Sequence, residues 1–448
     1  MDKPNILKIR DDHQPFRFIS KGESKFEFVS ERESTPKASW LASNASEFSL
    51  PNLRKGIEPW LTSLFQSEHL SLLVGSGLTT AIQNIANAKV PAGMSAPQLS
   101  SAHADKIKAT AKKSANAAGR GNSANIEDYI RVINELLVGL KILSKTTEAD
   151  ELQRELDEVL AKFASGILEG ERCIITAEKD KREEAFHKLV SFLMSFASRT
   201  GIRDRLNIFT TNYDRLIEAG AEIAGVHLID RFVGGLSPIF RSSRLDIDMH
   251  YNPPGIRGEP RYLEGVVRFS KLHGSIDWIE SENDVRRIGL PLGASDIDPY
   301  LNTPGLYDAS TNKLMIYPNA SKDRETTEYP FVELFRDFSA AICRPNNTLV
   351  TYGYSFGDDH INRIIRDMLT IPSTHLVIIS YDDGTGRINR FYQHKPAQIT
   401  LMVGDVLADV RLLTDYFLPK PAIDKASMRM AELLKQRYSV RSEEIDPE

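Results

Sequence analysis

Two short polar segments of this chain carry side chains that can do chemistry, and each follows an apolar run. The first is Asn207–Asp214, which contains Asn212 and Asp214, and the second is Phe269–Ser275, which contains His273. Together they supply an amide, a carboxylate and an imidazole at the expected ends of two strands. In open α/β sheets, ligands bind beyond the carboxyl ends of the strands. These groups therefore fit a site that acts on a sugar or a nucleotide.

Each of these side chains also has a structural interpretation. Asn212 or Asp214 can cap the helix that is expected to begin near Arg215, an interaction that contributes about 1 kcal/mol. His273 is one of ten histidines, and most lone histidines in proteins are structural. With an ordinary pKa of about 6.5, however, an imidazole can also act as a general base. Capping and ligand binding can coexist, and both interpretations stay open at this point.

A glycine turn precedes these segments in the chain. Ser71–Val74 reads as a short buried strand that enters Gly75-Ser76-Gly77. Glycines there allow the backbone to approach a phosphate at a helix N-terminus. The turn lacks the third glycine of the G-x-G-x-x-G pattern, because Thr80 stands in its place. A simple tight turn is the alternative interpretation.

A second loop, Tyr352–Asp359, follows another expected strand and precedes a helix. In this loop Ser355 can bond a phosphate or a ribose, while Asp358 or Asp359 caps the helix. Consecutive acidic residues followed by His360 at a helix start cannot all point to one ion. We therefore expect capping rather than a metal site here.

Strand-type and helix-type segments alternate after residue 200, which is typical of an α/β protein with a mostly parallel sheet. Besides Ser71–Val74, the expected strands are Leu206–Phe209, His227–Ile229, Val266–Leu272, Leu314–Tyr317, Thr348–Tyr354, His375–Ser380 and Gln398–Val403. The helices expected between them are Leu216–Ala224, Phe331–Cys343 and Ile361–Leu369. Apolar stripes with helical spacing between Ile126 and Arg199 predict a helical insertion. The predicted fold is Rossmann-like α/β with this insertion after the first strand-turn-helix.

The domain organisation follows from these patterns. Residues 1–54 form an N-terminal extension in which phenylalanines spaced by two predict short half-buried strands, or alternatively a partner-binding arm. Residues 55–415 form one α/β domain that contains the insertion at about 126–199. Residues 416–448 form a C-terminal tail with an amphipathic helix. Residues 101–125 are predicted to be a mobile loop, and residues 237–260 a loop or lid.

Composition narrows the class of protein. The formal charge is 56 − 61 = −5 without a block of like charges, which disfavours direct nucleic-acid binding. Two cysteines, Cys173 and Cys343, are too few for a zinc ribbon or a disulfide framework. No apolar run approaches the roughly 20 residues of a membrane span, and no signal peptide is visible. We expect a soluble cytoplasmic protein that needs no metal.

Five motifs in order resemble the sirtuin-like NAD-consuming domains of bacterial antiphage defence systems. They are Val74–Gly77, Phe209–Asp214, Lys271–Ser275, Gly353–Asp358 and Val403–Asp405, and the resemblance covers about residues 55–415. It implies that Asn212 lies at the nicotinamide ribose and that His273 is the catalytic base. As a hypothesis for the mechanism, we expect Asp214 to orient one of these two side chains. The NAD-binding residues it implies are Gly75, Ser76, Gly77, Thr210, Thr211, Gly353, Tyr354 and Ser355, with the first three at the diphosphate.

Departures from protein-deacylating sirtuins decide which activity the resemblance favours. Those enzymes carry a four-cysteine zinc module and a Gly-Ile-Pro-Asp-Phe-Arg run after the glycine turn. At the position of that run, this chain has the sequence Leu-Thr-Thr-Ala-Ile-Gln-Asn at residues 78–84. The resemblance thus implies an NAD glycohydrolase that releases ADP-ribose and nicotinamide and depletes NAD during phage infection. A protein deacylase, a non-catalytic NAD or ADP-ribose sensor and a structural scaffold are the alternatives. The resemblance also implies a second subunit as partner, and we expect a HerA-type hexameric ATPase or another defence-system subunit in this role. We further expect a homo-oligomer.

Overall fold

The protein is represented by a computed structural model. The structure describes residues 3–9, 12, 14–22, 24–29, 40–41, 47–88, 95–117, 124–197, 204–243, 249–251, 261–262, 265–281, 284–306, 313–314 and 329–420.

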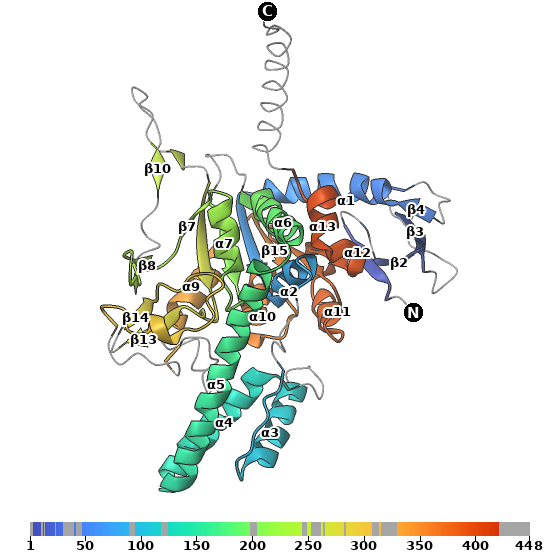
Figure 1. Ribbon diagram of the computed structural model, residues 1–448. Helices are drawn as coiled ribbons and strands as arrows, with labels where there is room; N and C mark the ends of the chain where they lie inside the picture. Colours follow the sequence, from blue (N-terminus) through green and yellow to red (C-terminus); the bar gives the residue numbers. More distant parts are fainter. Residues whose placement is uncertain are drawn as a thin grey trace, which may run out of the picture.

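Within these residues, an eleven-stranded sheet forms the centre of the molecule (Figure 1). Its parallel part has the spatial order β17-β16-β15-β5-β6-β12-β7. The bounds of these strands are His69–Val74 (β5), Asn207–Thr210 (β6), His227–Ile229 (β7), Val266–Lys271 (β12), Asn347–Tyr352 (β15), His375–Ser380 (β16) and Ile399–Val403 (β17). The predicted α/β class with a mostly parallel sheet is confirmed.

Helices cover both faces of the parallel strands, because successive strand residues point to opposite sides. On one face, Leu72 and Val350 pack in a cluster with α1 (Leu50–Phe65), α2 (Ser76–Ile85), α6 (Lys179–Ala197), α7 (Leu216–Ile223), α12 (Asp405–Ala408), α13 (Val410–Leu412) and a π-helix (Leu413–Phe417). On the other face, Leu73 and Leu349 pack with α9 (Phe331–Ile342), α10 (Asp359–Met368) and α11 (Arg387–Tyr392). Short 3-10 helices span Asp298–Tyr300 and Pro396–Gln398.

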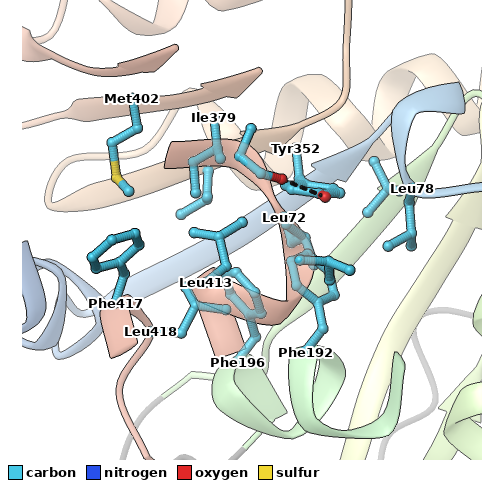
Figure 2. Packing of buried hydrophobic residues seen from close by; sticks show 14 of the residues in the cluster. Leu72, Leu78, Phe192, Phe196, Tyr352, Ile379, Met402, Leu413, Phe417 and Leu418 are labelled. Atoms are coloured by element: carbon cyan, nitrogen blue, oxygen red, sulfur yellow. Dashed lines mark hydrogen bonds between the residues drawn. The ribbon is translucent and has the colours of Figure 1, made fainter. Parts of the chain in front are cut away.

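Figure 2 shows the first face from close by. Phe192 and Phe196 of α6 approach the sheet beside Leu413, and the ring centroid of Tyr352 lies 4.9 Å from that of Phe192. The Tyr352 hydroxyl donates a hydrogen bond to the Ala408 carbonyl at 2.9 Å, so this buried polar group is satisfied. The close packing holds α6, which leads out of the helical insertion, against the middle of the sheet.

The N-terminal extension continues the sheet with antiparallel strands. They are β1 (Asn5–Lys8), β2 (Phe16–Ser20), β3 (Lys25–Phe28) and β4 (Glu47–Ser49), and β1 lies beside β17. The strands predicted from alternating phenylalanines are confirmed, since Phe16, Phe18 and Phe26 are buried. This arm is therefore part of the same sheet.

The helical stripes of the insertion are also confirmed as α4 (Ile126–Ile142), α5 (Thr146–Ile175) and α6. The prediction of a mobile loop at residues 101–125 is wrong for most of its length, since α3 spans Ala104–Ala117. Ile107, Ala111 and Ala115 are buried at spacings of four. They form a helical stripe on α3, and Ile107 and Ala111 share a hydrophobic cluster with residues of α4. Residues 118–123 lie outside the described residues.

A second, small sheet has the order β13-β14-β9-β8. Its strands are Trp278–Ser281 (β13), Asp284–Arg287 (β14), Ile239–Phe240 (β9) and Phe232–Val233 (β8), and a separate pair joins β10 (His250–Tyr251) to β11 (Arg261–Tyr262). The predicted loop at 237–260 thus contains β9 and β10, and its residues 244–248 and 252–260 are not described. Of the predicted strand Leu314–Tyr317, the structure describes only Leu314, which bridges to Ile279. The predicted C-terminal helix from residue 426 also lies outside the described residues.

Among the described helices, none is both long enough and apolar enough to cross a membrane.

His375, near the amino end of β16, makes the stability of this fold depend on pH. Its Nε2 lies 2.8 Å from the Thr400 hydroxyl, which also accepts a hydrogen bond from Trp60. Burial and the positive charge of Lys8 lower the pKa of His375 from 6.5 to about 4. Between these values the folded state binds fewer protons than the unfolded chain, so the free energy of unfolding falls as the pH falls.

We expect this loss to reach at most about 3 kcal/mol, because one pKa unit corresponds to about 1.4 kcal/mol. Urea unfolding between pH 7 and 4 should show a steeper decline for the wild type than for His375→Gln, which lacks the titrating group. Parallel curves for the two proteins would contradict this assignment.

Candidate active site

The register of the central strands brings four chain segments to one edge of the sheet. Val74 of β5 is level with Tyr352 of β15 and with Thr210 of β6, and Thr210 is level with Lys271 of β12. Because these strands are parallel, the loops that leave them emerge side by side. The edge lies where the chain order reverses, with β6 on one side of β5 and β15 on the other. In open α/β folds this position is the usual ligand site.

Two glycine turns, one after β5 (Gly75 to Gly77) and one after β15 (at Gly353), contact each other through their backbones. A Cβ atom on Gly75 would lie 2.4 Å from the Gly353 carbonyl oxygen, and one on Gly77 would lie 2.5 Å from the Gly353 Cα. The Gly75 and Gly77 amides donate to the Tyr352 and Gly353 carbonyls at 3.0 and 3.1 Å. Ser76, the first residue of α2, is exposed. Glycines are thus required here for backbone packing.

Asn212 is 7% exposed and sits between β6 and the glycine turn. Its Nδ2 donates to the Gly75 carbonyl at 3.0 Å and to the Thr79 hydroxyl at 3.1 Å. Because a carbonyl oxygen only accepts, the first bond fixes which end of the amide is nitrogen. The Oδ1 atom is buried and has no hydrogen-bond partner among the described residues. Asn212 therefore presents an unsatisfied acceptor at this edge.

The N-cap residue of α7 is Arg215, and the side chain that satisfies the first helical amide is that of Asp214 and not that of Asn212. The Asp214 Oδ1 accepts from the Leu216 amide at 3.1 Å, and its Oδ2 accepts from the Thr79 hydroxyl at 2.6 Å. Thr79 therefore links the carboxylate to the Asn212 amide. Thr210 and Thr211 join the end of β6 to the end of β5, since the Thr210 hydroxyl and the Thr211 amide both donate to the Val74 carbonyl.

His273 is the second residue after β12 and lies at the same edge of the sheet. Its Nε2 is 2.9 Å from the Asp358 Oδ2, and its side chain is 23% exposed. Its ring centroid lies 6.4 Å from that of Tyr213. The predicted capping by Asp358 is confirmed, since its Oδ1 accepts from the amides of His360 and Ile361. The pairing with His273 was not predicted.

The loop after β15 is anchored by Tyr354 and leaves Ser355 exposed. The Tyr354 hydroxyl donates to the Asn362 side chain at 3.1 Å, and burial raises the pKa of this phenol well above its usual value. Gly353 has φ +61°, a conformation that favours glycine. The Ser355 carbonyl accepts from Arg387 at 2.8 Å.

The fifth motif, at Gly404 and Asp405, is joined to the N-terminal strand. The Asn5 side chain donates to the Asp405 carboxylate at 2.8 Å and accepts from the Val406 amide at 3.0 Å. The extension thus reaches the carboxyl end of β17.

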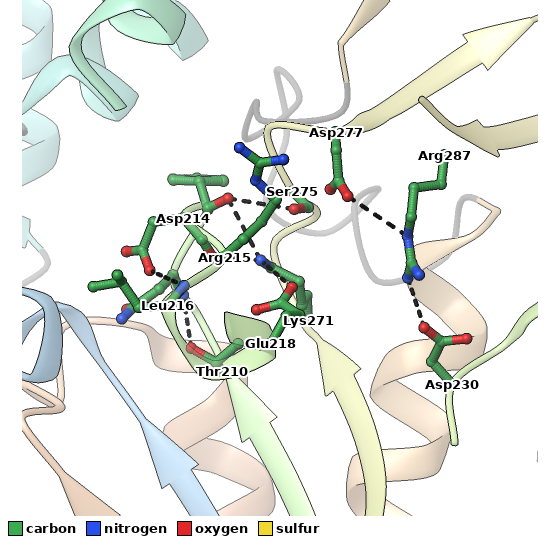
Figure 3. Close-up of polar contacts among 12 residues, drawn as sticks. Thr210, Asp214, Arg215, Leu216, Glu218, Asp230, Lys271, Ser275, Asp277 and Arg287 are labelled. Carbon is green, nitrogen blue, oxygen red and sulfur yellow. Dashed lines mark hydrogen bonds and ion pairs between the residues drawn. The ribbon is translucent and has the colours of Figure 1, made fainter. Parts of the chain in front are cut away.

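A buried lysine fastens β12 to the loop that follows β6 (Figure 3). Lys271 is 1% exposed, and its ammonium donates to the Asp214 carbonyl at 2.5 Å and to Glu218 at 2.9 Å. Burial raises the pKa of Glu218. Ser275 adds a bond to the Tyr213 carbonyl at 3.3 Å. The segments that carry Asn212 and His273 are therefore cross-linked to each other.

The helical insertion holds the same loop through a buried ion pair. Arg215 pairs with Glu171 of α5, and its guanidinium also donates to the carbonyls of Leu290 and Pro291. The Tyr213 hydroxyl donates to Glu127 of α4 at 3.0 Å. These partners are 44 to 86 residues apart in the chain, and no local pattern signals them. Sequence reasoning missed Thr79, Lys271, Arg215, Glu171 and Glu127.

Within the described ranges, no group of three His, Cys, Asp or Glu side chains is placed to hold a metal ion.

The fold and the edge together define a doubly wound α/β protein whose polar residues gather at the position typical of nucleotide sites. The model of the SIR2-like domain family matches residues 206–400. This match supports a sirtuin-like domain in the chain and an activity related to NAD. The matched range includes Asn212, His273 and Gly353, and the glycine turn after β5 precedes it. No curated protein matches the chain.

Proposed function

We propose that this protein is an NAD glycohydrolase that cleaves NAD into ADP-ribose and nicotinamide. The observation that carries the proposal is the buried, unsatisfied Asn212 Oδ1 at the sheet edge that also holds His273. An acceptor in this position suits a ribose hydroxyl or the attacking water. The SIR2-like match supports NAD as the molecule that binds.

Cleavage of the nicotinamide–ribose bond develops positive charge on the sugar while a neutral base departs. The protein therefore contributes mainly by positioning the sugar and the water and by stabilising charge. In this proposal Asn212 fixes the ribose or the water, and His273 accepts the proton that the nucleophile loses. Asp214 holds Asn212 through Thr79. Gly75, Ser76, Gly77, Thr210, Thr211, Gly353, Tyr354 and Ser355 would surround the rest of the dinucleotide.

Incubation of the purified full chain with NAD tests the proposal. We expect nicotinamide and ADP-ribose in equal amounts by chromatography. His273→Ala should lower the rate by about 100-fold or more, because a positioned general base contributes about 10²–10⁴-fold. Asn212→Ala should cause a loss on the order of 100-fold, because the ribose or the water is no longer held in the position for attack. The exposed residues Asn84 and His187 supply matched controls, and Asn84→Ala and His187→Ala should leave the rate unchanged.

Two other results would replace the proposal. Deacylation of an acetylated peptide at the expense of NAD would assign a protein deacylase instead. Binding of NAD without turnover, unaffected by His273→Ala, would assign a sensor. Nicotinamide release that survives both site substitutions would show that the reaction lies elsewhere.

We further propose a cytoplasmic homo-oligomer that acts in antiphage defence by NAD depletion, with a HerA-type ATPase as partner. This part is supported by the resemblance of the five sequence motifs. The incubation should therefore be repeated with such an ATPase, and cellular NAD should be measured during infection with wild type and His273→Ala.

A further inference from the structure

The two carboxylate oxygens of Asp358 have separate partners. Oδ1 accepts from the backbone amides of His360 and Ile361 at 2.9 and 3.2 Å and so caps α10. Oδ2 lies 2.9 Å from the Nε2 of His273, a residue 85 positions earlier in the chain. One side chain therefore joins the loop after β15 to the end of β12, across the glycine turn.

The loop around this carboxylate is held by its own hydrogen bonds. The Tyr354 hydroxyl donates to the Asn362 Oδ1 at 3.1 Å, and the Asn362 Nδ2 donates to the Phe356 carbonyl at 3.0 Å. Tyr354, Phe356 and Asn362 are all at most 5% exposed. The carboxylate is thus fixed in place before any ligand binds.

We propose that Asp358 is a positioning residue that sets the orientation and the tautomer of His273. The proposal rests on the glycohydrolase function given above. A carboxylate only accepts, so it selects the tautomer that carries its proton on Nε2 and assigns proton exchange to Nδ1. In the reaction, the water oxygen bonds to the ribose carbon as the bond to nicotinamide breaks with its electron pair. The water proton passes to Nδ1, and Asp358 stays ionised beside the imidazolium.

Asp358→Asn separates this role from helix capping. Asparagine is as good an N-cap as aspartate, so α10 should form and the melting temperature should stay close to that of the wild type. The carboxylate on Nε2 is lost, and with the Asn oxygen on the cap its NH₂ group faces Nε2 and favours the opposite tautomer. We expect kcat to fall by about 100-fold at an unchanged KM. Asp359→Asn, on the neighbouring exposed residue, is the matched control and should retain full activity.

A second prediction concerns the double variant. In a His273→Ala background, Asp358→Asn should cause no further fall in kcat, because Asp358 acts through His273. Full activity of Asp358→Asn, or additive losses in the double variant, would overturn the proposal.

A readout that does not need turnover keeps this inference separate from the proposed function. Nitrogen NMR of ¹⁵N-histidine-labelled protein distinguishes the two tautomers, and His273→Gln identifies the resonances of His273. The wild type should show the Nε2–H form and Asp358→Asn the Nδ1–H form. If the wild type does not cleave NAD, the glycohydrolase proposal fails while this spectrum still tests the pairing. An unchanged tautomer in Asp358→Asn would overturn the positioning role.

Discussion

Arg215→Met is expected to lower the free energy of unfolding by about 3–5 kcal/mol, because it leaves one member of a buried ion pair without its partner. Glu171 is fully buried, and Arg215 is 8% exposed at the side chain. Burial raises the pKa of the Glu171 carboxyl, and Arg215 opposes this rise. Without the guanidinium, Glu171 should bind a proton in the folded state at higher pH than in the unfolded chain.

Because of this protonation, the loss of unfolding free energy in Arg215→Met should depend on pH. A carboxyl whose folded pKa is raised loses its stabilising contribution as the pH rises from its unfolded pKa, about 4.3, towards its folded value. The deficit of Arg215→Met should therefore be larger at pH 8 than at pH 5 in urea unfolding.

Two further variants control for the loss of a positive charge. Arg411 pairs with Glu184 at a partly exposed position, and Arg411→Met should cost about 1 kcal/mol or less. Replacing both buried partners, as Glu171→Leu with Arg215→Met, should recover much of the loss, since a well-packed apolar pair can substitute for a buried ion pair. A deficit for Arg215→Met no larger than that of Arg411→Met would show that the pair contributes little.

Gly353→Ala is expected to separate the two glycine turns. The added Cβ would lie 2.5 Å from the Gly77 Cα, and the residue has φ +61°. Neither backbone can yield without breaking the bond from the Gly77 amide to the Gly353 carbonyl. The strained conformation and the overpacking together should lower the free energy of unfolding by about 2–5 kcal/mol. NAD cleavage, if present in the wild type, should be lost.

Helical glycines provide the matched comparison. Gly139 in α4 and Gly166 in α5 have nothing within 4 Å of an added Cβ. Gly139→Ala and Gly166→Ala should each stabilise the protein by about 0.5–1 kcal/mol, because alanine loses less entropy in a helix. Thermal unfolding compares the three variants directly. An unchanged melting temperature for Gly353→Ala would mean that the turns are not in tight contact.

Much of the α/β core could be predicted from the sequence, because parallel strands buried on both faces are short continuous apolar runs. His227–Ile229 and His375–Ser380 are strands with the predicted bounds. The placement of Asn212 and His273 at one edge also followed, since loops after parallel strands leave the sheet on the same side. Each of these features depends on residues that are close together in the chain, so its pattern can be recognised in the sequence.

The contacts between elements were not predictable in the same way. Whether Asp358 meets His273 depends on the register of β15 against β5, β6 and β12, which the apolar pattern does not specify. Helix α3 was missed because its buried stripe consists mainly of alanine, which also occurs in loops. Strands β8 and β9 have two residues each, too few to show a period.

The strand order also sets the time at which this site can form during protein synthesis. Gly77 emerges from the ribosome early, but the backbone it packs against, Gly353, follows 276 residues later. Strand β1 can pair with β17 only later still, because the residues of β17 lie about 400 positions downstream. A growing chain therefore holds Asn212 and His273 without the turn that completes their surroundings. Any activity at this edge begins only when nearly the whole described chain has been made.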